Sequence, residues 1–236
     1  MKSFNFEVYY SNLIFTMNIS QKINEIVACI PDHVKLVAVS KTKPNEDILE
    51  AYKGGYRIFG ENKPQELTLK YNDLPKDIEW HMIGHLQTNK VKYIAPFVKL
   101  IHAVDSIKLL KEINKQAEKN NRVIDCLLQF HIATEQSKFG LSLSEAEELL
   151  MSDNFKELQN VRIVGVMGMA SYSPDENQVR NEFRNLNDIF KFLRAKYFNT
   201  DDTFKEISMG MSGDYRLAIE EGSTIVRVGS SIFGGR

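Results

Sequence analysis

Short apolar runs alternate along the chain with segments in which apolar residues recur every three or four positions. Helical periodicity of this kind covers residues 107–117, 144–150 and 179–197. Eight runs have the length and the β-branched content of buried strands: 35–40, 57–60, 78–83, 100–104, 123–131, 161–169, 206–209 and 225–229. Repeated alternation of strands and helices predicts one α/β domain built on a parallel sheet.

Two features favour a single (β/α)8 TIM-type barrel over an open doubly wound sheet. A helical pattern at 20–30 precedes the first strand, and it can cover the gap between strand eight and strand one only if the sheet closes. Few residues follow the last strand, so we expect no final helix there. No G-x-G-x-x-G motif follows the first strand, which removes the main signal of a dinucleotide-binding sheet.

The first sixteen residues differ in character from the rest of the chain. They are rich in aromatic residues, and their apolar stretch is too short and interrupted for a signal sequence or a membrane span. The barrel pattern starts near Met17, itself a plausible initiator. We therefore expect residues 1–16 to be a disordered leader or a gene-model extension, and residues 17–236 to form the barrel.

Charge and cysteine usage narrow the class of partner. The chain has 30 lysine and arginine residues against 31 aspartate and glutamate residues, so nothing favours nucleic acid or an anionic membrane as partner. A small molecule is the expected partner. Cys29 and Cys126 lie far apart, outside any metal-binding spacing. We interpret both as buried free thiols of a reducing compartment, and expect a cytoplasmic protein.

Lys41 directly follows the first apolar run. An exposed loop cation is the ordinary interpretation of such a lysine. The carboxyl ends of barrel strands hold the active site in nearly all enzymes of this fold, however, and partial desolvation there would free the amine for Schiff-base formation. Lys43 precedes Pro44 and is expected to lead the chain away over the rim.

Two glycine- and serine-rich segments, 208–214 and 222–231, contain the ends of strands seven and eight and the loops after them. Glycine and serine are ordinary loop residues, but barrels commonly bind phosphate at this pair of loops, and Ser212, Ser230 and Ser231 can add hydroxyl donors. Arg227 lies inside the last strand, on the same face as Ile225 and Gly229. Its charge predicts either a structural ion pair or a guanidinium in the barrel mouth, against a cofactor ring.

His81 and His85 imitate the zinc motif H-E-x-x-H. Met82 replaces the glutamate, and the segment is strand-like, so the two imidazoles would not lie one turn apart on a helix. We therefore expect no metal.

Several of these segments, taken in order, closely resemble the pyridoxal phosphate homeostasis proteins, single-domain relatives of the N-terminal barrel of alanine racemase. The resemblance covers residues 18–235. Its most specific parts are 38–44 (Ala-Val-Ser-Lys-Thr-Lys-Pro), 59–62 (Phe-Gly-Glu-Asn), 80–90 (Trp-His-Met-Ile-Gly-His-Leu-Gln-Thr-Asn-Lys), 208–212 (Ser-Met-Gly-Met-Ser), 222–229 (Gly-Ser-Thr-Ile-Val-Arg-Val-Gly) and 232–234 (Ile-Phe-Gly). The chain departs from the family pattern at Lys63 and at 129–131.

The resemblance implies a set of residues for pyridoxal 5'-phosphate. Lys41 would carry the cofactor as a Schiff base, and Arg227 would lie by the pyridine nitrogen. The phosphate would be held by Ser212, its neighbouring backbone and the turn that follows strand eight. The complete predicted set is Lys41, Asn62, His81, Met209, Gly210, Ser212, Arg227, Gly229 and Ser230.

The resemblance also implies a function in intracellular vitamin B6 and linked amino acid homeostasis without substantial catalysis. An arginine donor keeps the ring nitrogen unprotonated, which weakens the cofactor as an electron sink. We expect a monomer that passes the cofactor to apo-enzymes.

Two other functions stay open. An amino-acid racemase of the alanine racemase type needs a second base, a tyrosine from a further domain for which the chain has no length. His81, His85 or His131 would have to replace it. A Schiff-base aldolase without cofactor is the other, disfavoured by Arg227 in strand eight and Lys41 on strand one.

Overall fold

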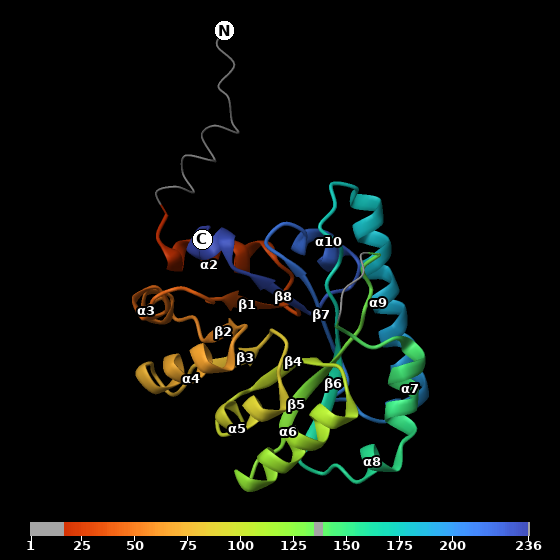
Figure 1. Ribbon diagram of the computed structural model, residues 1–236. Coiled ribbons are helices and arrows are strands. Elements are labelled where there is room, and N and C mark those ends of the chain that lie inside the picture. Colours follow the sequence, from red (N-terminus) through yellow and green to blue (C-terminus); the bar gives the residue numbers. More distant parts are fainter. Residues whose placement is uncertain (1–16, 135–138, 236) are drawn as a thin grey trace.

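Eight parallel strands form a closed barrel in sequence order, surrounded by helices (Figure 1). The computed structural model describes residues 17–134 and 139–235. The barrel is closed by pairing of the first and last strands, with Lys35 opposite Ile225 and Ala38 opposite Val228. The predicted fold class is confirmed.

The elements keep the order that the hydrophobic pattern predicts. The strands are β1 (Lys35–Val39), β2 (Ile58–Glu61), β3 (Glu79–Met82), β4 (Leu100–Val104), β5 (Ile124–Gln129), β6 (Val161–Met167), β7 (Glu206–Met211) and β8 (Ile225–Val228). The helices are α2 (Ile19–Cys29), α3 (Asn45–Lys53), α4 (Pro64–Asp73), the 3-10 turn η1 (Thr88–Lys90), α5 (Val91–Ile94), α6 (Ile107–Lys119), α7 (Leu143–Met151), α8 (Asp153–Lys156), α9 (Glu176–Tyr197), α10 (Tyr215–Glu220) and α11 (Ser230–Phe233).

Alternate strand residues face the two sides of the barrel wall, which separates two apolar layers. The larger layer lies between strands and helices and includes Phe59, Trp80 and Phe183. The smaller layer fills the barrel interior with six buried side chains: Val37, Leu100, Leu127, Val164, Met167 and Ile225. Buried polar side chains share the interior, and four of them are joined by hydrogen bonds and matter for the site: His81, His102, Ser208 and Arg227.

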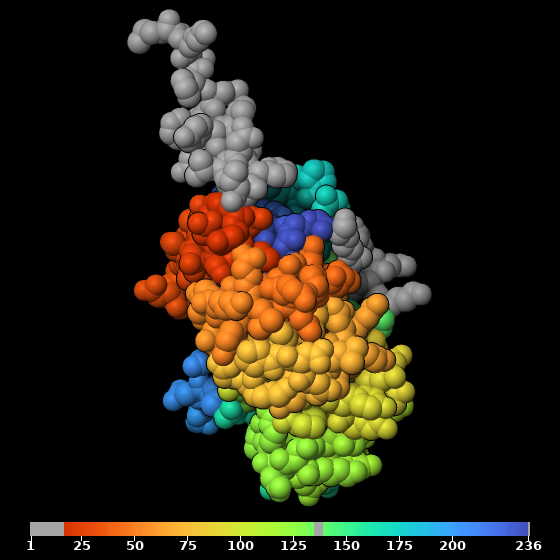
Figure 2. Space-filling view, turned by 90° about the vertical axis from the view of Figure 1, so that its left-hand side faces the viewer, coloured from red at the N-terminus to blue at the C-terminus, as the bar shows by residue number. Residues whose placement is uncertain are grey.

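Helix α2 covers the closure of the barrel, as expected. A capping box between Asn18 and Gln21 starts the helix. Glu50 of α3 anchors it, since its carboxylate accepts from the Ile19 N–H at 2.7 Å and its carbonyl accepts from the Ser20 hydroxyl at 2.8 Å. Figure 2 shows the C-terminal residues, in blue, directly against α2, in red. The expectation that no helix follows β8 was wrong, because the single-turn α11 packs there.

Two further expectations concern the cysteines and the leader. Cys126 is buried as predicted, but Cys29 is exposed at the end of α2, where it points away from the apolar face formed by Ile23 and Ile26. Both thiols are free. Residues 1–16 lie outside the described part of the chain. Within the described ranges, no helix combines the length and the apolar character needed to cross a bilayer.

Candidate cofactor-binding site

A cleft of about 630 Å³ opens at the carboxyl ends of the strands. Loops that follow β1, β2, β6, β7 and β8 form most of its wall. Of the nine residues predicted to bind a cofactor, the structure brings six together here: Lys41, Asn62, Ser212, Arg227, Gly229 and Ser230. In a barrel this end is where ligands bind.

Lys41 reaches the cleft from a tight turn at the end of β1. Ser40 is fully buried, whereas Lys41 is half-buried and borders the cleft. The Lys43 N–H donates to the Ser40 carbonyl at 3.0 Å, which closes the turn around Lys41 and Thr42. The strand therefore delivers the lysine to the cleft and ends immediately before it.

Ser212 and Gly229 connect the two loops that were predicted to hold phosphate. The Ser212 hydroxyl oxygen accepts from the Gly229 N–H at 3.0 Å. Among the described residues no group accepts the hydroxyl proton itself, so Ser212 can donate it to a ligand. A Cβ at Gly229 would lie 3.1 Å from the Val39 carbonyl oxygen, a tight contact, so the close approach of β8 to β1 favours glycine here.

Asp214 orders the loop after β7. Its carboxylate accepts from the Met211 N–H at 2.5 Å. Burial raises the pKa of Asp214, and this hydrogen bond and the positive charge of Arg227 act in the opposite direction. The carboxylate lines the cleft and was not predicted, although its place after Ser212-Gly213 is typical of a loop-stabilising aspartate.

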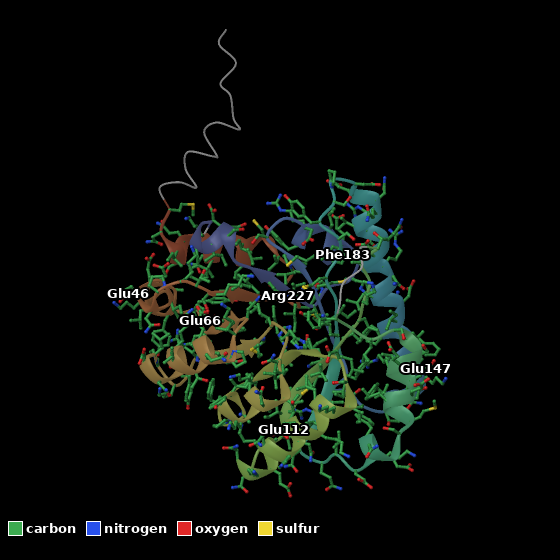
Figure 3. The ribbon with its side chains drawn as sticks, in the orientation of Figure 1. Glu46, Glu66, Glu112, Glu147, Phe183 and Arg227 are labelled. Carbon is green, nitrogen blue, oxygen red and sulfur yellow. The ribbon has the colours of Figure 1, made fainter. Side chains whose placement is uncertain are left out.

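Arg227 lies on β8 (Figure 3), where its side chain is buried in the barrel interior and borders the cleft. Its Nη1 donates to Ser208 Oγ at 2.6 Å and its Nη2 to the Gly168 carbonyl at 3.0 Å. Burial lowers the pKa of the guanidinium to about 10, with Asp214 opposing, so it stays protonated at neutral pH. No carboxylate among the described residues lies within 4.0 Å of the Arg227 guanidinium. Within this part of the chain, the structural ion pair that the sequence left open is therefore not formed.

A chain of hydrogen bonds continues from Arg227 through the barrel interior. Ser208 Oγ lies 2.9 Å from His102 Nδ1, and His102 Nε2 lies 3.0 Å from His81 Nδ1. Arginine can only donate hydrogen bonds, so we assign the donor direction of the chain from Arg227 towards His81. Each residue between them accepts from the residue before it and donates to the residue after it. Ser208 then donates to His102, and both imidazoles carry their proton on Nε2.

His81 and His102 are both neutral at physiological pH. Burial, followed by the charges of Lys35 and Lys99, lowers the pKa of His81 to about 3. Burial, with the His81 and Arg227 charges adding to it, holds the pKa of His102 well below its usual value. The imidazoles are thus fixed hydrogen-bonding groups at neutral pH, since neither takes up a proton there.

Three predicted cofactor residues do not line the cleft. His81 borders a second cavity, of about 510 Å³, at the opposite end of the barrel. Met209 packs into the layer between strands and helices, because alternation along β7 turns Ser208 inward and its neighbour outward. Gly210 has a φ of +92°, and a Cβ there would lie 2.6 Å from the Ala218 Cβ, so it permits α10 to pack on β7.

Other residues of the cleft carry no strong signal in the sequence. The loop after β6 contributes Met169, Ser171 and Tyr172. Glu182 of α9 holds this loop, since its carboxylate accepts from the Ser171 N–H at 2.6 Å and from the Thr134 N–H at 2.9 Å. Burial opposes ionisation of Glu182, but these hydrogen bonds outweigh it and lower the pKa.

Lys43 was expected to leave over the rim, but it lines the cleft. Its Nζ donates to the carbonyls of Phe233 and Gly235 at 2.9 and 3.0 Å. The turn after β1 is therefore fastened to the segment after β8.

Comparison with known proteins gives the family. The chain matches the family model described as alanine racemase, N-terminal domain, over residues 14–236. The pyridoxal phosphate homeostasis protein of Aquifex aeolicus is 43% identical over 203 residues, which cover 86% of this chain and 87% of the relative. The chain belongs to the pyridoxal phosphate homeostasis protein family. The human pyridoxal phosphate homeostasis protein is 37% identical, over 92% of this chain and 84% of the relative.

Solved structures agree with this family. PipY of Synechococcus elongatus, a structure with PLP bound, is 32% identical with a TM-score of 0.82, covering 92% of this chain and all of PipY. The alanine racemase of Bartonella henselae, with covalently bound pyridoxal phosphate, is 16% identical with a TM-score of 0.66, and 58% of it is covered. Its likeness to this chain, 92% of which it covers, shows the fold alone.

Proposed function

We propose that this protein binds pyridoxal 5'-phosphate through a Schiff base to Lys41 and serves in vitamin B6 homeostasis without substantial catalysis. The observation that carries the proposal is that Lys41, from the start of the chain, lines one cleft with Ser212 and Arg227, from its end. The bound cofactor in the structure of PipY supports the assignment.

The residues of the cleft fit the three polar parts of this cofactor. Ser212 has a hydroxyl proton to donate to a phosphate, and its oxygen is already fixed by Gly229. Arg227 is a buried cation whose protein partners are two neutral oxygens, and a pyridine nitrogen is a suitable further acceptor. Lys41 supplies the amine. A buried charge with no carboxylate in direct contact is costly, so a ligand acceptor at Arg227 would offset part of that cost.

The cofactor supplies a reactive aldehyde when it is bound. Lys41 would hold the cofactor through a Schiff base, in which a C=N bond would replace the C=O bond and the oxygen would leave as water with both amine protons. No oxidant or further reactant is required. The reaction is reversible, which suits a protein that stores and releases an aldehyde.

The case against substantial catalysis rests on Arg227 and on the histidines. A guanidinium donor leaves the ring nitrogen unprotonated, which disfavours the carbanion through which racemisation passes. None of His81, His85 and His131, considered from the sequence as second bases, lines the cleft. A positioned base contributes about 10²- to 10⁴-fold, so without one turnover would be close to background.

The test is the visible spectrum of the purified protein with pyridoxal 5'-phosphate, before and after borohydride reduction and peptide mapping. We expect a yellow protein whose reduced adduct maps to Lys41. Lys41→Ala should lose the long-wavelength band and remain folded, whereas the exposed Lys63 can be changed to Ala as a control that keeps it. An adduct on Lys43 would contradict the assignment.

Catalysis and transfer are tested separately. Deuterium incorporation at the α-carbon of L-alanine should be absent or marginal, and turnover like that of a dedicated racemase would establish the racemase function instead. We propose that the protein acts in the cytoplasm as a monomer and donates the cofactor to apo-enzymes. Light scattering checks the monomer, and reactivation of an apo-transaminase by the loaded protein checks the transfer.

A further inference from the structure

The turn that presents Lys41 contains a strained residue. Thr42 has a φ of +64°, in the left-handed region. The turn from Ser40 to Lys43 places Thr42 at the third position, and turns with a positive φ at that position usually have glycine or asparagine there. A β-branched residue in this conformation is an outlier, and such strain persists only where the surroundings impose it.

A buried lysine beneath the turn, Lys70, uses all three of its ammonium protons in hydrogen bonds. The Lys70 ammonium, from α4, donates to the Ser40 carbonyl at 2.8 Å, to Glu61 Oε1 at 2.8 Å and to Glu66 Oε1 at 2.7 Å. Its side chain is only 6% exposed. An ammonium has three protons, so these acceptors use all of its donor capacity.

The two carboxylates hold the residues on both sides of Lys41. Glu61, at the end of β2, accepts from the Ser40 hydroxyl at 2.6 Å. Glu66, in the first turn of α4 (Figure 3), accepts from the Thr42 N–H at 2.6 Å. Ser40 and Thr42 are therefore bound to one charged cluster, the Lys70 cluster, which we define as Glu61, Glu66 and Lys70. The residue between them is the lysine that lines the cleft.

A buried ion pair is by itself weak grounds for a role in stability, because apolar residues of similar volume often serve as well. The Lys70 cluster differs from a plain ion pair in what it contacts. Each of its members is bonded to the backbone or hydroxyl of the turn, which apolar side chains could not reproduce.

We infer that Glu61, Glu66 and Lys70 are positioning residues for Lys41: they hold the turn, with Thr42 in its strained conformation, so that the amine is aimed into the cleft. The inference rests on the proposed function, since it assumes that Lys41 forms the Schiff base. None of the three residues lines the cleft, so their effect on a ligand must pass through the turn.

The experiment separates the imine from the other contacts by using two ligands. Pyridoxal 5'-phosphate can react with Lys41, whereas 4-deoxypyridoxine 5'-phosphate has a methyl group in place of the aldehyde and cannot. Stopped-flow absorbance gives the rate of imine formation, and fluorescence titration gives the affinity of the analogue. Wild type with borohydride trapping at Lys41 is the reference that tests the proposed function.

Glu66→Ala is the main variant, because its side chain is 23% exposed and its loss leaves the more buried Glu61–Lys70 pair intact. We expect imine formation to slow by about tenfold to a hundredfold, the scale of a small displacement of a reacting group, with analogue affinity changed less than about twofold. Glu66→Gln keeps an oxygen acceptor for the Thr42 N–H and should restore most of the rate. Lys196→Met removes an exposed ion pair with Glu147 and serves as the control, with no effect on either ligand.

The double variant Glu61→Gln/Lys70→Met removes the charges of the buried pair together, and the Glu66 carboxylate that loses Lys70 is 23% exposed. The double variant should show the same selective loss of rate. Unchanged imine formation in Glu66→Ala and in the double variant would overturn the inference, and so would equal weakening of both ligands. Failure of wild type to form an adduct at Lys41 would instead refute the proposed function.

Discussion

Ser208→Ala tests whether the polar chain of the barrel interior holds Arg227 in place. The hydroxyl lies 2.6 Å from Arg227 Nη1 and 2.9 Å from His102 Nδ1, and all three side chains are buried. A hydrogen bond to a charged group contributes about 1.5–3 kcal/mol and a neutral one about 0.5–1.5 kcal/mol. Both are lost in the variant, so we expect the free energy of unfolding to fall by about 2–4 kcal/mol.

Urea denaturation followed by far-UV circular dichroism measures this change. Ser223→Ala is the matched control, because Ser223 is equally buried but its hydroxyl lies close only to neutral carbonyl oxygens, those of Met209 at 2.8 Å and Ile225 at 3.0 Å among them. We expect the control to cost about 1 kcal/mol. If Ser208→Ala cost no more than Ser223→Ala, the guanidinium would have another acceptor, and the assigned role of the chain would be refuted.

Three more predictions concern pH, the phosphate loop and a packing glycine. Because the pKa of His81 is lowered to about 3 and that of His102 is lowered as well, the unfolded chain binds more protons below pH 6.5. The free energy of unfolding should therefore fall as the pH drops from about 6.5 towards 3, with each histidine contributing on the order of 1 kcal/mol per pH unit. His102→Gln should make the urea midpoint depend less steeply on pH. Ser212→Ala should weaken retention of pyridoxal 5'-phosphate by about 1–2 kcal/mol in equilibrium dialysis, and unchanged affinity would place the phosphate elsewhere. Gly210→Ala should lower the unfolding free energy by about 2–4 kcal/mol, from overpacking against Ala218 plus the positive φ, whereas Gly213→Ala, with open space around it, should be nearly neutral by calorimetry.

The barrel could be predicted because its determinants are local in the sequence. Each apolar run became a strand, and α2 was found from its own periodicity. The inward face of Arg227 followed from alternation with Ile225. The same rule applied to β7 would have turned Ser208 inward and Met209 outward, so the sequence held a signal that the Met209 side chain lies outside the cleft.

The Lys70 cluster and the interior chain could not be predicted in this way. Lys70 lies in a helix among other charged residues, and only the packing of α4 against the end of β1 shows that it is buried. The contact between His81 and His102 depends on the relative position of β3 and β4, which is a tertiary property. Residues that act through distant partners leave no pattern in the local sequence.

The position of the cleft at the seam of the barrel has a consequence for biosynthesis. Lys41 follows the first strand, whereas Ser212 and Gly229 follow the last two, and β1 and β8 are neighbours only after closure. During synthesis, β1 therefore leaves the ribosome and exposes the lysine long before the loops after β7 and β8 have been made. A ligand that touches both walls can be captured only after β8 has left the ribosome, and once bound it would resist the opening of the seam and delay unfolding that begins there.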